Sequence, residues 1–251
     1  MEHKSFIREV PGSDTAVLMI HGILGTPRHF DMLLQEIPES WSVYNILLPG
    51  HGGSASDFGH SSMQQWREAA QITFDELCGR YRRILLVGHS MGTLFSLSMA
   101  ISRPEKVGGL FLLAVPLRVF MKPVMAANAL RVTFGMMRED DPRQTASRDC
   151  CGVQTTWKLW QYIPWIPRFL ELFVEMAATE KRLPLLGVPA IALQSEQDEL
   201  VSLRSGKKLK KNPLIRVIPL PGSGHYYYPD ADRTVMLQVF RDMCEALDNL
   251  R

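Results

Sequence analysis

Residues 88–92 read Gly-His-Ser-Met-Gly, a serine between two glycines at the spacing of a nucleophile on a tight turn. The apolar run 83–87 before it has the length of a strand, and residues 93–100 read as the start of a helix. At such a turn the serine adopts a positive φ with its Oγ exposed at the end of a sheet, and the glycines let strand and helix approach closely. The alternative is that Ser90 only caps the helix. The flanking strand and helix favour the nucleophile.

A serine hydroxyl needs a base to take its proton and a third group to orient that base. Where the serine sits on such a turn, the acid and the histidine follow it along the chain, each in a loop after a later strand. The expected strand 214–219 runs into Leu-Pro-Gly-Ser-Gly-His, which ends at His225. Because His225 is the only histidine after position 89, it is predicted to be the base.

The acid is expected in residues 194–201, which follow the expected strand 188–193 and contain three carboxylates. Asp198 is preferred over Glu196 and Glu199, because the apolar pair Leu200-Val201 after it would tuck the loop under the site. Its role would be to hold the imidazole tautomer and to stabilise the imidazolium, without taking the proton itself.

Two backbone N–H groups are expected to stabilise the oxyanion formed during acyl transfer. One belongs to Met91, directly after the serine at the start of a helix. The other is predicted at Ile23, in a loop where Gly22 and Gly25 permit a sharp turn. His21 in the same loop is expected to brace it by hydrogen bonds.

Apolar runs alternating with helical patterns predict the elements that must position these residues. Such β-α alternation indicates an α/β fold with a mostly parallel, doubly wound sheet and helices on both faces. Strands are expected at 16–20, 41–48, 84–87, 109–115, 188–193 and 214–219, and helices at 27–37, 62–79 (with Gly79 as the stop), 93–102, 167–179 and 232–247.

One connection is far longer than the ~10–12 residues that a β-to-β crossover needs. Residues 116–183 are therefore predicted to be a lid inserted between two parts of the core, 1–115 and 184–251. The insertion is rich in methionine and aromatic residues, which suit either an adaptable apolar pocket wall or the small core of the lid itself. These residues include Val119, Phe120, Met121, Met125, Phe134, Met136, Met137, Trp157, Trp160, Tyr162, Ile163, Trp165 and Ile166.

Five segments in this order give the chain a family resemblance: His21-Gly22, residues 48–54 (Leu-Pro-Gly-His-Gly-Gly-Ser), 88–92, 194–201 and 223–225. On these motifs the chain resembles the α/β-hydrolase superfamily, and within it the serine carboxylesterase and monoacylglycerol lipase group. The resemblance spans about residues 15–245 apart from the lid. It implies that Ile23 and Met91 form the oxyanion hole and that His51 lies near the site but outside the triad. The lid carries no motif from which acyl or alcohol pockets can be inferred.

The predicted function is hydrolysis of carboxylic esters with apolar acyl groups, such as monoacylglycerols or short- to medium-chain esters, through an acyl-serine intermediate. A thioesterase or acyltransferase with the same triad is the alternative. In that case the cations of residues 204–211 (Arg204, Lys207, Lys208, Lys210, Lys211) would meet an anionic carrier, although a solvated helix face is the favoured explanation of this cluster. A non-catalytic small-molecule receptor is disfavoured, because a receptor has no need of all three triad residues.

Composition, charge and cysteine spacing bear on the possible partners, location and cofactors of the protein. The 251-residue chain has a net charge of only +2, which gives no indication of nucleic-acid binding. No apolar run is long enough to span a bilayer and residues 1–8 do not resemble a signal peptide, so a cytoplasmic location is expected. The four cysteines lack metal-ligand spacing, and reduced thiols are favoured over a Cys150–Cys151 disulfide. No metal or organic cofactor is predicted, and the sequence gives no indication of oligomeric state.

Overall fold

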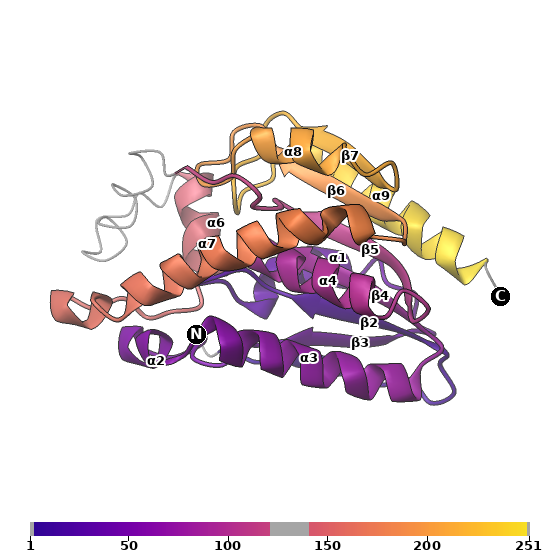
Figure 1. The fold of residues 1–251 in the computed structure, drawn as a ribbon, viewed down its shortest axis with the longest axis horizontal. Helices are drawn as coiled ribbons and strands as arrows, with labels where there is room; N and C mark the ends of the chain where they lie inside the picture. Colours follow the sequence, from indigo (N-terminus) through magenta and orange to yellow (C-terminus); the bar gives the residue numbers. More distant parts are fainter. Residues whose placement is uncertain (1–2, 121–140, 250–251) are drawn as a thin grey trace.

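The computed structural model describes residues 3–120 and 141–249. Within these residues, seven strands form one sheet in the order β1-β3-β2-β4-β5-β6-β7 (Figure 1). All neighbouring strands are parallel except the edge pair, in which β1 runs antiparallel to β3. The sheet is thus the mostly parallel one that the sequence predicts. The strands are β1 Phe6–Arg8, β2 Thr15–Ile20, β3 Ser42–Ile46, β4 Arg83–His89, β5 Val107–Leu113, β6 Ala190–Ser195 and β7 Ile215–Leu220.

Helices cover both faces of the sheet (Figure 1). One face is covered by α3 (Met63–Arg80), α4 (Met91–Ser102), α7 (Trp165–Arg182) and α8 (Arg204–Leu209). The other is covered by the short helices η1 (Pro27–Phe30) and α1 (Asp31–Leu34) and by the long α9 (Asp230–Asp248). The remaining helices among the described residues are α2 (Ala55–His60), α6 (Pro142–Cys150), η2 (Leu159–Tyr162) and η3 (Leu183–Leu185).

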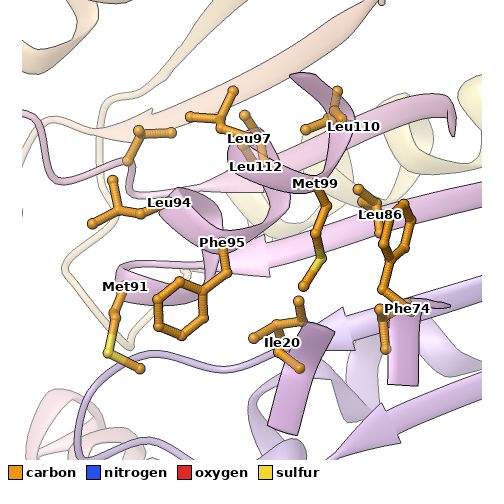
Figure 2. Packing of buried hydrophobic residues seen from close by; sticks show 14 of the residues in the cluster. Ile20, Phe74, Leu86, Met91, Leu94, Phe95, Leu97, Met99, Leu110 and Leu112 are labelled. Atoms are coloured by element: carbon orange, nitrogen blue, oxygen red, sulfur yellow. The ribbon is translucent and has the colours of Figure 1, made fainter. Parts of the chain in front are cut away.

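The central strands are apolar on both sides because each side faces a separate core. In β2, Leu18 and Ile20 point to the core under α3 and α4, whereas Val17 and Met19 point to the core under α9. This alternation explains the continuous apolar runs in the sequence. Figure 2 shows the first core, where Phe95 and other α4 side chains gather beside β2 and β4.

Two glycines let α4 pack tightly against the sheet. A Cβ on Gly92 would overlap the carbonyl oxygen of Ile20, and a Cβ on Gly88 would lie 2.8 Å from the backbone nitrogen of Thr93. The glycines on either side of Ser90 are therefore required by close approach, as the sequence predicts. The turn between β4 and α4 is consequently fixed by the close approach of the backbone at both glycines.

Several predicted boundaries are wrong in informative ways. The helix expected at 27–37 is only η1 followed by one turn of α1, and Ile37 precedes Pro38, which disfavours helical backbone there. Gly79 does not stop α3, which continues to Arg80. The edge strand β1 and the helices α2, α6, η2 and η3 were not predicted, whereas α8 agrees with the helix face considered for residues 204–211.

Of the insertion, residues 116–120 and 141–183 are described, and this part contains α6, η2 and α7. Tyr162 and Trp165 pack against the core, and the Trp165 Nε1–H donates to the Ala55 carbonyl (2.8 Å). Trp157 and Trp160 instead are 70% and 60% exposed, so the aromatic residues split between inward and outward faces. Met121, Met125, Phe134, Met136 and Met137 lie outside the described residues. Within the described ranges no helix is both long and apolar enough to cross a bilayer.

Candidate active site

Ser90 lies at the turn between β4 and α4 with φ 50° and ψ −120°, a conformation that L-residues rarely adopt. Its backbone is held on both sides: its N–H donates to the Leu113 carbonyl (2.9 Å), and its carbonyl accepts from the Thr93 hydroxyl (2.6 Å). Only 5% of the residue is exposed. The geometry is that of a nucleophile elbow, with the strain supported by surrounding hydrogen bonds.

Asp198 and His225 form a buried pair, each only 2% exposed. His225 Nδ1 lies 2.9 Å from Oδ2 and 3.1 Å from Oδ1 of Asp198. Because a carboxylate only accepts, Nδ1 carries the proton and Nε2 is left as the basic nitrogen. Of the three carboxylates weighed from the sequence, the structure pairs Asp198 with the histidine, and Glu196 is exposed.

The loop of Asp198 explains how a buried carboxylate stays ionised. Burial opposes ionisation, but His225 and the backbone N–H groups of Leu200 and Val201 overcome it, so the pKa of Asp198 lies below its ordinary value. Both N–H groups donate to Oδ1 at 2.8 Å. The predicted tucking of this loop by the Leu200-Val201 pair is therefore achieved through their backbone amides.

His89 connects the elbow with the histidine loop. Its Nε2 donates to the carbonyl oxygen of His225 (3.1 Å), and the two ring centroids are 4.8 Å apart. Since His89 immediately precedes Ser90, this contact brings the loop of His225 to the elbow. Ser90, Asp198 and His225 thus follow the carboxyl ends of β4, β6 and β7, at one edge of the sheet.

The loop after β2 packs against the serine. A Cβ on Gly22 would lie 2.9 Å from Ser90 Cβ, so only glycine allows this approach. Ile23 follows directly and is 8% exposed, and Met91 is buried in the first turn of α4. First-turn N–H groups have no acceptor within their own helix. Of the two residues predicted to stabilise an oxyanion, Met91 therefore follows Ser90 directly and Ile23 follows the glycine that packs against Ser90.

Two buried histidines brace this loop. His21 Nε2 accepts from the Leu48 N–H (3.0 Å), so its Nδ1 donates to the Gly22 carbonyl (2.9 Å). His51 Nε2 accepts from the Leu24 N–H (3.2 Å). Burial lowers the pKa of His21 to about 4 and that of His51 well below 6.5, so both are neutral at pH 7. The bracing predicted for His21 agrees with these bonds, whereas that of His51 was not predicted.

Two further carboxylates hold the histidine loop and were not given this role from the sequence. Glu199 Oε2 accepts from the His225 backbone N–H (2.9 Å). Asp232, at the start of α9, accepts from the Gly222 N–H (2.8 Å) and the Ser223 hydroxyl (2.6 Å). In the sequence analysis Glu199 was considered only as an alternative to Asp198 for the acid of the triad. Nothing in the sequence singles out Asp232, because its partners lie in another loop.

No cluster of three or more metal-binding side chains occurs in the part of the chain that the structure describes. All four cysteines are free thiols.

The sequence from residue 17 to residue 237 matches the model of the alpha/beta hydrolase family. The chain belongs to this family. Solved structures of similar fold include a metagenome-derived lipolytic enzyme (TM-score 0.73, 21% identity, 97% of both chains). A monoacylglycerol lipase from Paleococcus ferrophilus is also similar (TM-score 0.67, 16% identity, 98% of this chain and 99% of that one). At these identities the likeness establishes the shared fold of this hydrolase family.

Curated relatives match over shorter stretches. A pimeloyl-acyl-carrier protein methyl ester esterase from Neisseria meningitidis is 31% identical over 140 residues, which cover 53% of this chain and 51% of that protein. A carboxylesterase from Bacillus subtilis is 26% identical over 121 residues, which cover 47% and 48%. The chain thus spans about half the length of these alpha/beta hydrolase relatives.

Proposed function

We propose that this alpha/beta hydrolase is a serine esterase that cleaves carboxylic esters of apolar acyl groups. Ser90 is the nucleophile, His225 the base, Asp198 the orienting acid, and the N–H groups of Ile23 and Met91 the oxyanion hole. The observation that carries the proposal is the buried Asp198–His225 pair, which leaves Nε2 of His225 basic at the sheet edge where Ser90 lies. The esterase names of the relatives support the same reaction class.

In the first half of the reaction, His225 Nε2 takes the proton from Ser90 Oγ as the oxygen attacks the ester carbonyl. The carbonyl oxygen becomes an anion and accepts hydrogen bonds from the two N–H groups. The carbon–oxygen bond to the alcohol then breaks, and the imidazolium returns its proton to the leaving alcohol. In the second half, His225 takes a proton from water as the water attacks the acyl-serine. The bond between the acyl carbon and Ser90 Oγ then breaks, the imidazolium returns its proton to Oγ, and the acid is released.

The surroundings of Ser90 suit an apolar acyl group. The serine itself is nearly inaccessible, and its neighbours Ile23 and Met91 are buried hydrophobic residues. Exclusion of water strengthens the hydrogen bonds to an oxyanion, because they act in a medium of low dielectric constant. We propose further that residues 116–183 act as the lid over this site, supported by the contacts of Trp165 with α2.

The test is kcat/KM on a p-nitrophenyl ester series from acetate to palmitate, with Ser90→Ala as the control. A buried methylene contributes ~0.8 kcal/mol, so kcat/KM should rise about tenfold per two carbons until the pocket is full. Ser90→Ala should lower kcat by roughly 10⁴–10⁶. Retention of more than a tenth of the wild-type activity would remove Ser90 from the mechanism. If kcat/KM does not change with acyl-chain length but a fluorophosphonate still labels Ser90, the triad assignment stands and the proposal of an apolar acyl ester as substrate is refuted.

A second candidate is hydrolysis of acyl groups attached to an anionic carrier, which the cations of α8 and the residues after it favour. Lys208 is already paired with Glu180 (2.6 Å), so Lys207 and Lys211 are the better choices for a test. One relative is named for an acyl-carrier-protein ester, which supports the same candidate. Replacing both lysines by Gln should raise KM for a coenzyme A thioester and leave p-nitrophenyl esters unaffected. An unchanged KM for the thioester would refute this second candidate function.

A further inference from the structure

A short segment of the insertion, residues 151–154, is hydrogen-bonded across two loops of the core; it is called the strap below. The Gly152 N–H donates to the Leu24 carbonyl (2.7 Å), and the Gly152 carbonyl accepts from the Gly52 N–H (2.5 Å). The Gln154 N–H donates to the Gly53 carbonyl (2.9 Å). The strap therefore joins the loop that contains Ile23 to the Pro-Gly-His-Gly-Gly loop through backbone atoms alone.

The strap fits against the Ile23 loop only because residue 152 is glycine. A Cβ at this position would overlap the Gly25 carbonyl oxygen and lie 2.6 Å from Thr26 Cγ2. The carbonyl belongs to the backbone of the loop, so it cannot rotate away as a flexible side chain would. Val153, the next residue, is 5% exposed and belongs to the main core, which anchors the strap in place.

The loop that the strap contacts is strained at Leu24, whose φ of 59° is unfavourable for a residue with a Cβ. Such a conformation persists only where the surroundings hold it. Leu24 is held from both sides, since its N–H donates to His51 and its carbonyl accepts from Gly152. The insertion thus supplies one of the two hydrogen bonds that hold Leu24.

The Ile23 N–H belongs to the peptide unit whose carbonyl is that of Gly22. That carbonyl accepts from His21 Nδ1 and from the Gly25 N–H (2.9 Å each), which sets the plane of the peptide from one side. The strap fixes Leu24 on the other side. The backbone of Ile23 is thereby held at both ends, and the bond from Gly152 supplies the restraint at one of them.

We infer that the strap orients the oxyanion hole and that Gly152 is a positioning residue for catalysis. This inference rests on the proposed esterase function. The insertion would accordingly do more than cover the site, because it completes the support of a group that contacts the transition state. Removing one oxyanion donor lowers kcat by about 10²–10³, which sets the upper limit for misaligning it.

The test compares Gly152→Ala with Gly187→Ala. Gly187 is exposed, and a Cβ there would meet no atom within 4 Å, so this variant controls for the glycine-to-alanine change itself. Gly152→Ala should lower kcat about 10²-fold and leave KM within about threefold, because the N–H acts on the transition state. Binding of an aryl boronate, which forms a tetrahedral adduct with the serine, should weaken by the same factor. Equal kcat in the two variants, or a change confined to KM, would overturn the inference.

A second pair of variants decides the matter if Gly152→Ala does not fold. Gln154→Pro deletes the N–H that donates to Gly53, whereas Gln154→Ala keeps it, and the side chain of Gln154 is exposed. Gln154→Pro should lower kcat about tenfold relative to Gln154→Ala, and equal values would overturn the inference. Wild-type ester hydrolysis, abolished by Ser90→Ala, is measured first. If the wild type is inactive on esters, the proposed function fails; if it is active and the strap variants match their controls, only the inference fails.

Discussion

Asp198→Asn should inactivate the protein through the tautomer of His225. Oδ1 of Asp198 accepts two backbone N–H groups, those of Leu200 and Val201, while Oδ2 faces His225 Nδ1. In the asparagine variant the amide oxygen must stay at the two N–H donors, so the NH₂ group faces the imidazole. Nδ1 then has to accept, and the proton moves to Nε2. An imidazole protonated at Nε2 cannot take the proton of Ser90.

The alternative amide orientation does not rescue the variant. Turning the oxygen toward His225 would place the NH₂ group against two buried N–H donors, and each unsatisfied donor costs about 1–3 kcal/mol. The two neutral tautomers of imidazole differ by less than this sum, so the tautomer changes and the amide does not turn. A triad with the wrong tautomer loses about 10⁴ in kcat, or ~5.5 kcal/mol of transition-state stabilisation.

The assay is kcat for a p-nitrophenyl ester, measured alongside thermal unfolding to show that the variant remains folded. Glu196→Gln is the matched control, because it neutralises the exposed carboxylate two residues away. It should keep kcat within about twofold of wild type. The reasoning is refuted if Asp198→Asn retains more than about a hundredth of wild-type kcat, or if Glu196→Gln is the more damaging change.

Two further predictions concern the support of the site. Glu199→Ala leaves the His225 backbone N–H without its acceptor, which costs about 1–3 kcal/mol, so kcat should fall about tenfold. Glu199→Gln keeps an acceptor, so its kcat should stay within about threefold of wild type. Equal kcat for the two variants would contradict this role of Glu199. Burial, followed by repulsion from neighbouring histidines, lowers the pKa of His29 to about 3, and burial lowers that of His21 to about 4. Between these values and the unfolded pKa of about 6.5 the unfolded chain binds more protons, so stability is highest above pH 6.5 and falls as the pH drops. In urea unfolding at pH 7.5, 6.0 and 5.0, the free energy of unfolding should fall below pH 6 by about 1.4 kcal/mol per pH unit for each of these two histidines. An unchanged urea midpoint would refute the conclusion that His21 and His29 are buried in the neutral form.

The predicted sheet follows from local patterns. The central strands are apolar over most of their length because both of their faces are covered, and that leaves continuous apolar runs such as 16–20 and 84–87 in the sequence. The turn at Ser90 is equally local, since Gly88 and Gly92 are required within five residues. Short elements escaped prediction for the opposite reason. Strand β1 has three residues and helix α2 six, too few for a periodic pattern.

The sequence by itself determined the alpha/beta architecture, the serine on its turn, and His225 as the only later histidine. The architecture and the turn follow from the spacing of residues that are close in sequence, and the assignment of His225 follows from the lack of any other histidine after position 89. Both kinds of information can be read directly from the sequence. Only the tertiary structure paired Asp198 with His225 in place of Glu196 or Glu199, because all three carboxylates occur within four residues and differ chiefly in burial and direction. It also placed Gly152 against the loop of Ile23. A contact between residues more than a hundred positions apart leaves no local pattern, since only the folded backbone brings the two segments together.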